Sequence, residues 1–494
     1  MSNTEAGTLF RLYGGLNQES RRARAVSRWI PIAAAVACHA VDNTLIDVPP
    51  QPVNIVEVAS TSSDSLGAIV SHAASTDDSI RVHYRMTDGS ESGATPWQSA
   101  QQPVTVLGLK PGGEYAMWIE ASRERETVNG SQDVYEVPPL PQGISGLRID
   151  VTGAFSSGYS LAPLPGADGH GYLVIFDSVG TIRWYRDFGP NPVSQATQQQ
   201  NGHFTAYVGK SNGFNQTNGA FVEVTARGDS VRSIAAPAGT YTDPHDLVQT
   251  FASDGSSITY LFGYQIRNYE RSVAGGPAGL LAIHQLLAID DAGQADTLFD
   301  GAGHWGANES IEPPGIPDLD HPNSLDFDRN GNAIVSYRDL NAIVSIDPNT
   351  KQVLWQLGGI RNQFTFVNDP WGGFDGQHDV RVLPNGHLIV FDNGWMHTPR
   401  RSRAVEYALD LSRMTATMVW QYAPSPSLFN DFTGSAQRLA NGNTLVAFTR
   451  CGIVDEVRPD GSLVARATIK LASGAVGTPY RVTRINNPYS FARP

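Results

Sequence analysis

Residues 321–337 read His-Pro-Asn-Ser-Leu-Asp-Phe-Asp-Arg-Asn-Gly-Asn-Ala-Ile-Val-Ser-Tyr, and this stretch gives the clearest indication of the fold. Two short apolar runs flank the dipeptide Asn330-Gly331. Asn-Gly between two strand-like runs is the strongest short-range signal of a β-hairpin, because these residues tolerate the positive φ that a tight turn requires. The stretch therefore predicts two antiparallel strands, the first of which begins at a histidine.

The same order of residues returns at 378–391, where a strand begins at His378 and turns at a second Asn-Gly pair. Another hairpin follows each of these two, at 342–355 and at 404–420, so each unit predicts four antiparallel strands. Partial or complete copies of the pattern occur at 171–184, 201–234, 245–262 and 437–467. The chain is therefore built from a repeated unit.

Repeated four-stranded units of about 40 to 55 residues are typical of a β-propeller, and we predict six blades between residue 146 and the C-terminus. A last strand-like stretch at 480–485 has no partner in its own unit. We expect it to pair with the first unit and close the ring. An irregular β-sandwich is the alternative, but it does not require the tryptophans that recur at the ends of units, Trp184, Trp355 and Trp420.

The composition agrees with many short strands. The chain has 494 residues, enough for two or three domains, and its 49 Gly and 31 Pro favour turns over helices. The formal net charge of −13 argues against nucleic acid as a partner, because binding phosphates requires clustered Lys and Arg. An acidic surface of this kind favours solubility.

Residues 46–142 differ from the repeats. They alternate in short β-rich runs, carry Leu109-Lys-Pro-Gly-Gly-Glu-Tyr before one of these runs, and end in the proline-rich linker 137–141. This pattern resembles a fibronectin type III module, which is a small β-sandwich. The sequence thus predicts an all-β protein with an N-terminal segment at 1–45, a β-sandwich at 46–142 and a six-bladed β-propeller catalytic domain at 143–494.

The first residues have the order of a targeting segment. A cluster of arginines at 21–24 precedes an apolar stretch at 29–40 that is too short to span a bilayer as an ordinary helix. Ala-Val-Ala-Cys38 is a weak match to a lipoprotein cleavage box. We expect a periplasmic or other extracytoplasmic protein with lipidation of Cys38 as a membrane tether; a short disordered or buried segment is the alternative. Cys38 and Cys451 are the only cysteines, so the sequence has no disulfide framework.

Three histidines occupy equivalent places in the repeats: His245, His321 and His378, each near the start of the first strand of a unit. In a propeller these innermost strands begin near the central channel on one face. We therefore expect the three imidazoles to converge there. Residues two apart in a strand project from one face, which puts Asn323 beside His321.

Two amides and a guanidinium complete the predicted cluster. Counting outward from the first Asn-Gly turn places Asn323 opposite Arg338, and counting from the second places His378 opposite Asn393. An Arg fork and amide donors suit a tetrahedral oxyanion such as phosphate or sulfate, and a histidine can act as nucleophile or general base near neutral pH. The sequence has no phosphate-binding loop or dinucleotide fingerprint. These residues indicate transfer of a charged group without a cofactor.

In their local sequences these residues resemble one family. The shared features are His245 within Pro-His-Asp, His321-Pro-Asn323, Arg338 within Ser-Tyr-Arg-Asp-Leu-Asn-Ala-Ile, Trp355-Gln-Leu-Gly-Gly, and Gln377-His378 followed by Phe-Asp-Asn-Gly394. Together they resemble the bacterial aryl-sulfate sulfotransferases, which do not use the nucleotide sulfate donor. The resemblance covers most of the repeats and, loosely, the segment before them.

The resemblance implies a six-bladed propeller behind a small β-sandwich, and a ping-pong transfer of a sulfuryl group from an aryl sulfate to a phenol. His378 matches the nucleophile that is transiently sulfated. The residues that match those holding the sulfuryl oxygens are His245, His321, Asn323 and Arg338, and a histidine would also act as general acid or base. Asn393 is a further candidate for substrate binding. The expected partners are small aromatic substrates, with Trp305, Trp371 and Trp395 as candidate walls.

The sequence also departs from the family. The closely spaced cysteine pair of its better-known periplasmic members is missing, and large insertions follow Phe262 and Trp355. Asp246 and Asp379 directly follow two of the predicted histidines, but they point to the other strand face and are interpreted as structural. The remaining histidines, including His203, His284, His304, His387 and His397, lack the repeat placement and are left out of the site.

Two alternatives from other classes stay open. His245, His321 and His378 could bind a divalent metal or iron, which would make the protein a metal-dependent lyase, hydrolase or oxygenase. Arg338 counts against a metal because a fixed cation repels it, whereas the two aspartates count for it because they can orient ligands. The second alternative is a non-catalytic binding module, such as a glycan or sulfate-ester receptor. The sequence does not indicate the oligomeric state.

Overall fold

The computed structural model describes residues 49–61, 66–74, 78–124, 126–209, 219–269, 279–306, 308–311 and 318–485. Within these ranges the regular structure is β-strand apart from two short 3-10 helices, η1 (Gly301–Gly303) and η2 (Thr449–Cys451), so the all-β prediction is confirmed. None of the described helices has the length and apolar character needed to cross a membrane. The predicted N-terminal segment, including Cys38, lies outside the described residues.

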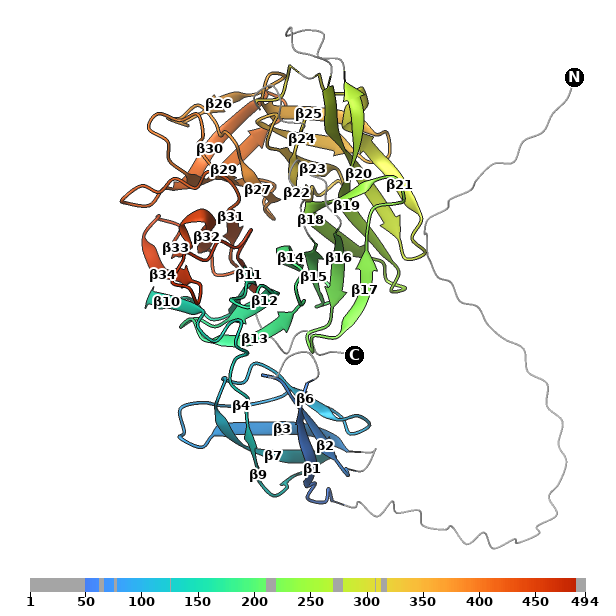
Figure 1. Ribbon diagram of the computed structural model, residues 1–494, viewed down its shortest axis with the longest axis vertical. Coiled ribbons are helices and arrows are strands. Elements are labelled where there is room, and N and C mark those ends of the chain that lie inside the picture. Colours follow the sequence, from blue (N-terminus) through green and yellow to red (C-terminus); the bar gives the residue numbers. More distant parts are fainter. Residues whose placement is uncertain are drawn as a thin grey trace, which may run out of the picture. The chain divides into compact units, whose positions relative to one another are not determined.

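Between Arg148 and Ile485 the described strands form six sheets of four or five strands each, and the sheets follow one another around a ring (Figure 1). This is a β-propeller, as predicted, and the number of sheets matches the number of blades expected. Neighbouring sheets pack through apolar clusters; one of them joins Val335 and Val344 of the fourth sheet to Leu286 and Phe299 of the third. The ring therefore has a continuous apolar wall between adjacent sheets.

The first sheet contains β11 (Tyr159–Pro165), β12 (Gly171–Phe176), β13 (Ile182–Asp187) and β35 (Thr483–Ile485). The second contains β14 (Val193–Gln198), β15 (Phe204–Val208), β16 (Ala220–Val224) and β17 (Ser230–Ile234). The third contains β18 (Tyr241–Phe251), β19 (Ser257–Tyr269), β20 (Gly279–Asp290) and β21 (Ala295–Asp300). The fourth sheet contains β22 (Pro322–Phe327), β23 (Ala333–Tyr337), β24 (Ala342–Asp347) and β25 (Gln352–Gly358). The fifth contains β26 (Thr365–Val367), β27 (His378–Val382), β28 (Leu388–Asp392), β29 (Arg403–Asp410) and β30 (Thr415–Tyr422). The sixth contains β10 (Arg148–Gly153), β31 (Ser435–Arg438), β32 (Thr444–Phe448), β33 (Ile453–Val457) and β34 (Leu463–Lys470).

Two strands from opposite ends of the repeats close the ring. β35 pairs antiparallel with β11, Tyr159 facing Ile485, which is the pairing expected for residues 480–485. β10 pairs with β34 in the last sheet. Each strand satisfies backbone groups that would otherwise form an exposed sheet edge, so closure removes a site for unwanted strand pairing.

The predicted hairpins are present, but their register differs from the one expected. Arg338 donates its backbone N–H to the carbonyl of His321 (3.0 Å) and does not face Asn323. The reason is twofold: the turn is one residue longer than a two-residue loop, closed by the bond from Asp328 N to Asn332 O, and a bulge interrupts the pairing between Pro322 and Ser324. His378 likewise pairs with Phe391 and not with Asn393, because a bulge follows it.

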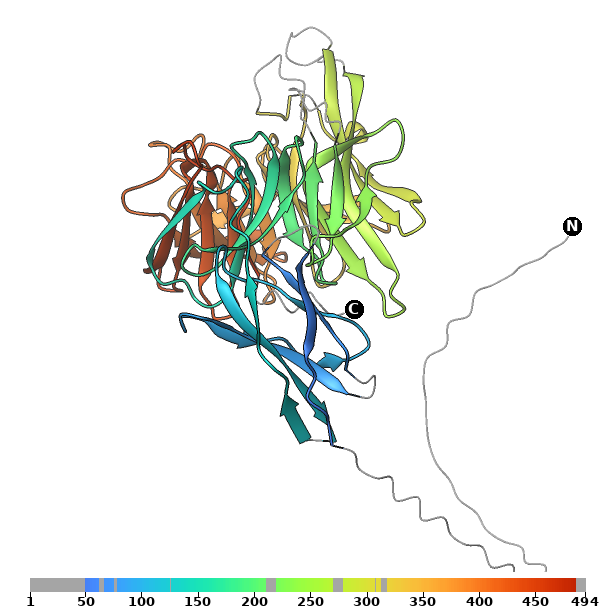
Figure 2. The ribbon, with the colours of Figure 1, turned by 60° about the horizontal axis from the view of Figure 1, so that its bottom comes forward.

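Residues 55–136 form two further sheets, coloured blue to teal in Figures 1 and 2. One contains β1 (Ile55–Ser60), β2 (Ala68–His72) and β6 (Val104–Val106); the other contains β3 (Ser79–Met86), β4 (Ser92–Ala94), β5 (Gln98–Ser99), β7 (Glu114–Arg123), β8 (Glu126–Asn129) and β9 (Asp133–Glu136). Val70, Val82 and Ile119 belong to one buried cluster that the two sheets share. The fibronectin type III assignment and the domain boundaries stay predictions, since the contacts group Pro49–Pro494 into one unit.

Candidate active site

A polar cavity of about 370 Å³ lies on the axis of the ring, because one strand of each of the six sheets contributes to its lining. Asp246 of β18 and Asp379 of β27 are among the lining residues. Each of them directly follows a predicted site histidine, so His245 and His378 lie at one end of this channel. His321, which directly precedes β22, completes the set of three neighbouring inner strands.

Two of the three histidines lie beside a tyrosine that the sequence did not indicate as a site residue. The ring centroids of His245 and His321 are 4.5 Å apart. The ring of Tyr480 lies 5.6 Å from that of His245 and 6.3 Å from that of His378, in both cases edge to face. Tyr480 precedes β35, so the strand that closes the ring also brings a phenol ring into the centre of the cluster.

Local backbone irregularities direct these side chains toward the axis. The pairing of β18 shifts between Thr242 and Leu247, so His245 lies in a bulge. His321 has a positive φ of 48° and Asp379, next to His378, one of 53°. Bulges and left-handed non-glycine residues cost conformational energy and concentrate where a side chain must be re-aimed, so their presence at all three histidines marks this end of the channel.

The partners of His378 fix which of its nitrogens carries the proton. Asn393 donates from Nδ2 to the carbonyls of Asn430 (2.8 Å) and Thr433 (3.0 Å), so its Oδ1 is the atom that faces His378 Nδ1 at 2.8 Å. Gly376 O also lies 3.1 Å from Nδ1. Two acceptors at Nδ1 require a proton there, which leaves a lone pair on Nε2; the backbone N–H of Thr433 points at that lone pair from 3.2 Å.

His378 is held neutral by its surroundings. Its side chain is buried, and burial lowers its pKa well below the usual histidine value, because a charged imidazolium loses its hydration there. The charge of Arg338 lowers the pKa further, and His321 and His245 act in the same direction. A neutral imidazole with a fixed lone pair is the form of histidine that can act as a nucleophile.

His245 and His321 share a second arrangement, in which a carboxylate holds the Nδ1 atom. Asp243 Oδ1 lies 2.8 Å from Nδ1 of His245, and Asp318 Oδ2 lies 2.7 Å from Nδ1 of His321. Burial lowers the pKa of His321, partly offset by Asp318. Because each carboxylate accepts a proton-bearing Nδ1, the Nε2 atoms of both rings are left for other partners.

The structure brings Asn323 and Arg338 to the cluster by contacts other than those predicted. Asn323 donates from Nδ2 to the carbonyl of Gln377 (2.7 Å), the residue before His378, and thereby joins two inner strands. Arg338 pairs with Asp339 through Nη1, and its charge acts on the pKa of both His321 and His378. Asn393 contacts His378 as described above. All six predicted site residues are thus connected at one end of the channel.

A layer of buried ion pairs lies directly behind the histidines. Asp246 pairs with Arg381 (3.0 Å) and Arg481 (3.1 Å), and Asp379 pairs with Arg481 (3.2 Å). Burial alone would raise the pKa of Asp246, but the two guanidinium charges lower it. The interpretation of Asp246 and Asp379 as structural agrees with these contacts, since each carboxylate links inner strands of different sheets.

The three tryptophans that the sequence suggested as walls of the substrate site have different surroundings. The ring of Trp305 is buried at 2% exposure against Tyr337 and belongs to the core of the third and fourth sheets. Trp371 packs against His397 and lies under the guanidinium of Arg403 (4.1 Å). Trp395 donates from Nε1 to the carbonyl of Asp431. Trp305 is therefore a core residue and not a wall, because no face of its ring is open to a ligand.

Three clusters in the described ranges have residues of metal-ligand type: His284, Asp318 and Asp320; Asp318, His321 and Asp339; and Asp375, Asp392 and His397. None of them combines His245, His321 and His378, the set considered for a metal from the sequence. In the first, both ring nitrogens of His284 already face carboxylates, and in the third both nitrogens of His397 do so. Ion pairing accounts for these two arrangements.

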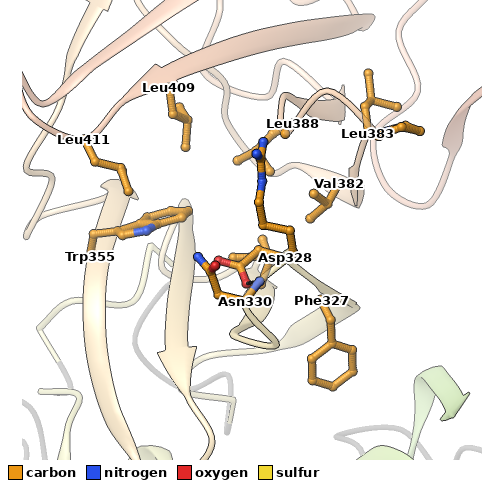
Figure 3. Close-up of a pocket in the computed structure, with 13 residues that line it drawn as sticks. Phe327, Asp328, Asn330, Trp355, Val382, Leu383, Leu388, Leu409 and Leu411 are labelled. Carbon is orange, nitrogen blue, oxygen red and sulfur yellow. Dashed lines mark hydrogen bonds between the residues drawn. The ribbon is translucent and has the colours of Figure 1, made fainter. Parts of the chain in front are cut away.

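A larger cavity of about 450 Å³ lies at the hairpin turns between the fourth and fifth sheets (Figure 3). Trp355, Leu409 and Leu411 line one side of it, and Val382 and Leu383 the other. Its lining contains none of the predicted site residues and no histidine. The axial cavity, by contrast, adjoins the predicted site residues, and the pKa values of both His321 and His378 are lowered there.

Two sequence comparisons bear on this site. A family model described as arylsulfotransferase (ASST) matches residues 296–470. The chain is similar to the arylsulfotransferases over this range. The match includes His321, Asn323, Arg338, His378 and Asn393, and it stops short of His245 and Tyr480. No curated protein matches the chain.

Similar solved structures have low sequence identity. A protein of unknown function from Bacteroides caccae is 14% identical, with 67% of this chain and 100% of that chain covered and a TM-score of 0.41. Virginiamycin B lyase from Staphylococcus aureus is 10% identical, with 65% of this chain and 88% of that chain covered and a TM-score of 0.32.

Proposed function

We propose that the protein is an aryl-sulfate sulfotransferase, which moves a sulfuryl group from an aryl sulfate to a phenol through a sulfohistidine at His378. The observation that carries this proposal is the state of His378: a buried neutral imidazole whose Nδ1 proton is held by Asn393, which leaves the lone pair on Nε2, where the backbone N–H of Thr433 faces it. The arylsulfotransferase match over residues 296–470 supports it.

In the first half-reaction the Nε2 lone pair of His378 attacks sulfur. The bond between sulfur and the aryl oxygen breaks, its electron pair leaves with that oxygen, and the resulting phenolate takes a proton. In the second half-reaction the acceptor phenol loses its proton and its oxygen attacks sulfur. The sulfur–nitrogen bond then breaks and returns its pair to Nε2, so the enzyme is regenerated without a cofactor.

His245, His321 and Arg338 are the groups proposed to stabilise the sulfuryl oxygens. The Nδ1 atoms of both histidines are held by carboxylates, so the Nε2 atoms are oriented before substrate arrives. Arg338 is a permanent donor, whereas each of the two rings donates from Nε2 only in its protonated form; groups that are oriented in advance act on developing charge without reorganisation. The backbone N–H of Thr433, whose φ of 62° turns it toward His378, is a further donor in the same place.

One of the paired histidines is proposed to move the proton. The rings of His245 and His321 are in edge-to-face contact, and the carboxylates of Asp243 and Asp318 lie within ion-pair distance of them. A histidine that is charged when the phenolate leaves can protonate it, and the same ring can then accept the proton of the incoming phenol. That ring thus serves as acid in the first half-reaction and as base in the second.

The test uses a chromogenic aryl sulfate as donor and a phenol as acceptor. We expect release of the donor phenol and formation of the acceptor sulfate, both lost in His378→Ala and both insensitive to a metal chelator. After mixing with donor alone, intact-mass measurement should find one sulfuryl group on the wild type and none on the variant. Absence of turnover and of labelling with any aryl sulfate, together with bound metal, would favour a metal-dependent reaction instead.

A further inference from the structure

His284 lies in the middle of β20 and is buried between two carboxylates, with 1% of its side chain exposed. Its Nδ1 is 2.7 Å from Asp320 Oδ1 and its Nε2 is 3.2 Å from Asp243 Oδ2. A carboxylate accepts hydrogen bonds and has no proton to give at neutral pH, so both ring nitrogens carry protons. His284 is therefore an imidazolium in the interior of the protein.

The electrostatics agree with this geometry. Burial alone would lower the pKa of His284, but the charges and hydrogen bonds of Asp320, Asp243 and Asp318 outweigh it and raise the pKa well above the usual histidine value. The other group that faces the imidazole is the ring of Tyr264 on β19, at a centroid distance of 5.3 Å. Three buried carboxylates thus share one cation, which offsets the cost of removing them from water.

The carboxylates that hold His284 also hold the two paired histidines. Oδ2 of Asp243 lies 3.2 Å from Nε2 of His284, an ion-pair distance, and Oδ1 of Asp243 accepts from the backbone N–H (2.9 Å) and Nδ1 (2.8 Å) of His245. Asp318 lies 3.8 Å from His284 Nδ1 and accepts from His321 Nδ1 at 2.7 Å. One carboxylate therefore lies between His284 and each paired histidine: Asp243 next to His245 and Asp318 next to His321.

We infer that His284 is a positioning residue: a permanently charged imidazole that fixes Asp243 and Asp318 and thereby presents Nε2 of His245 and His321 to the sulfuryl group. This inference rests on the proposed function for its kinetic consequence. Its structural part concerns the charge state of one buried ring, which can be measured without substrate.

A metal ion held by His284, Asp318 and Asp320 is the competing explanation for this cluster. A ligating imidazole must offer a lone pair, so one of its two carboxylate contacts would have to be given up. An imidazolium and a metal ligand also differ in the chemical shifts of the ring nitrogens. The two explanations are therefore separable by spectroscopy.

The first measurement is nitrogen-detected NMR of the full chain labelled at histidine, from mildly acidic to mildly alkaline pH. We expect one histidine with both ring nitrogens at imidazolium shifts across this range, and we expect its signal to be missing from His284→Gln. A neutral His284, a His284 that titrates near the usual value, or bound metal in stoichiometric amount would overturn the inference. The outcome does not depend on whether sulfuryl transfer occurs.

The second measurement is a double-mutant cycle on sulfuryl transfer with His284→Gln and Asp243→Asn. If His284 acts through Asp243, the double variant should be no less active than Asp243→Asn alone, whereas independent effects would multiply. We expect kcat/KM of His284→Gln to fall about 10- to 100-fold, as for other residues that orient catalytic histidines. Multiplying losses, or an unchanged His284→Gln in an active wild type, would overturn the inference and leave the proposed function standing.

His203→Gln is the matched control. His203 also pairs its Nδ1 with a buried carboxylate, Glu223 at 2.7 Å, but in the second sheet and without contact to a predicted site residue. We expect this variant to keep wild-type activity. Circular dichroism and thermal unfolding of all variants distinguish loss of the fold from a misplaced histidine. His284→Lys restores the positive charge but has its donors on a single nitrogen atom. Compared with His284→Gln, it should recover part of the lost stability but not the rate.

Discussion

Oδ1 of Asn393 lies 2.8 Å from Nδ1 of His378, and this contact determines which nitrogen of the imidazole carries the proton. An amide in this place stabilises the tautomer without adding charge. A carboxylate would stabilise the same tautomer but would also favour the imidazolium. The hydrogen bond to Asn393 by itself raises the pKa of His378, but burial and the charge of Arg338 outweigh it, so the pKa is lowered and the imidazole stays neutral.

Replacing the nucleophile should abolish transfer. In His378→Ala we expect kcat/KM to fall about 10³-fold or more, since the groups that bind the sulfuryl oxygens cannot form the covalent intermediate. Steady-state assay of phenol release measures this. His387→Ala is the control, because His387 also starts a strand-like run after a hairpin turn but pairs with Glu406 (2.7 Å) away from the axial cluster. Equal losses in both variants would contradict the role of His378.

Changing Asn393 should separate orientation from charge. Asn393→Ala removes the acceptor for the Nδ1 proton, and we expect an approximately 10- to 100-fold loss of kcat. Asn393→Asp keeps an acceptor but raises the pKa of His378, so a larger share of the imidazole is protonated at a given pH. The acidic limb of its pH–rate profile should therefore move to higher pH. An Asn393→Asp profile identical to that of the wild type would contradict the assignment.

The pH profile of the wild type should extend into acid. Reaction requires neutral His378, and because burial and then the charge of Arg338 lower its pKa, the acidic limb should lie below the usual histidine value of about 6.5. Arg338→Met should move that limb to higher pH and lower kcat/KM about 10²-fold, whereas Arg338→Lys should leave the limb near its place. Equal pH profiles for the two variants would show that charge is not the cause.

The stability of the fold should depend on the same titration. The unfolded chain protonates His378 at about pH 6.5, but the folded chain does not until lower pH. The unfolded state thus binds more protons just below pH 6.5, so the contribution of His378 to the free energy of unfolding is present above that pH and is lost as pH falls toward the folded pKa. The difference in the free energy of unfolding between wild type and His378→Ala should therefore be largest above pH 6.5 and shrink as pH falls, which denaturant unfolding across this range measures.

The ion-pair layer behind the histidines should be essential to stability. Arg481→Met leaves two buried carboxylates, Asp246 and Asp379, each short of a cation, and we expect a loss of about 3–5 kcal/mol in the free energy of unfolding. Denaturant unfolding measures it. Arg413→Met is the control, since Arg413 is an exposed residue whose pair with Asp410 contributes little. A loss below about 1 kcal/mol for Arg481→Met would contradict the structural role of this layer.

The sequence predicted the sheets better than their register. Self-similar hairpins predict a propeller because each unit carries its own turn and its own alternation of apolar residues, and these are local signals. The pairing of Asn323 with Arg338 was wrong, because a longer turn and a bulge each shift the count and neither has a clear signature. His321, with its positive φ of 48°, likewise departs from the regular strand that the pattern implies.

The site residues found by repeat position are those at the starts of inner strands. His284 was set aside because it lies on β20, the third strand of its sheet, and only packing brings it behind Asp243. Tyr480 was considered only as part of a strand. A local signal was present for the carboxylates: Asp243 and Asp318 precede His245 and His321 by two and three residues, close enough for each to hold Nδ1.

Closure of the ring has a consequence for when the protein can work. Tyr480 and Arg481 directly precede the strand that pairs with β11, and Arg481 contacts the carbonyl of Asn323 as well as both aspartates behind the histidines. A chain released without its last residues would keep most of its blades and all three predicted site histidines, but it would lack Tyr480 and Arg481. Under the proposed function we expect such an incomplete chain to be inactive, so that activity would arise only once the ring has closed.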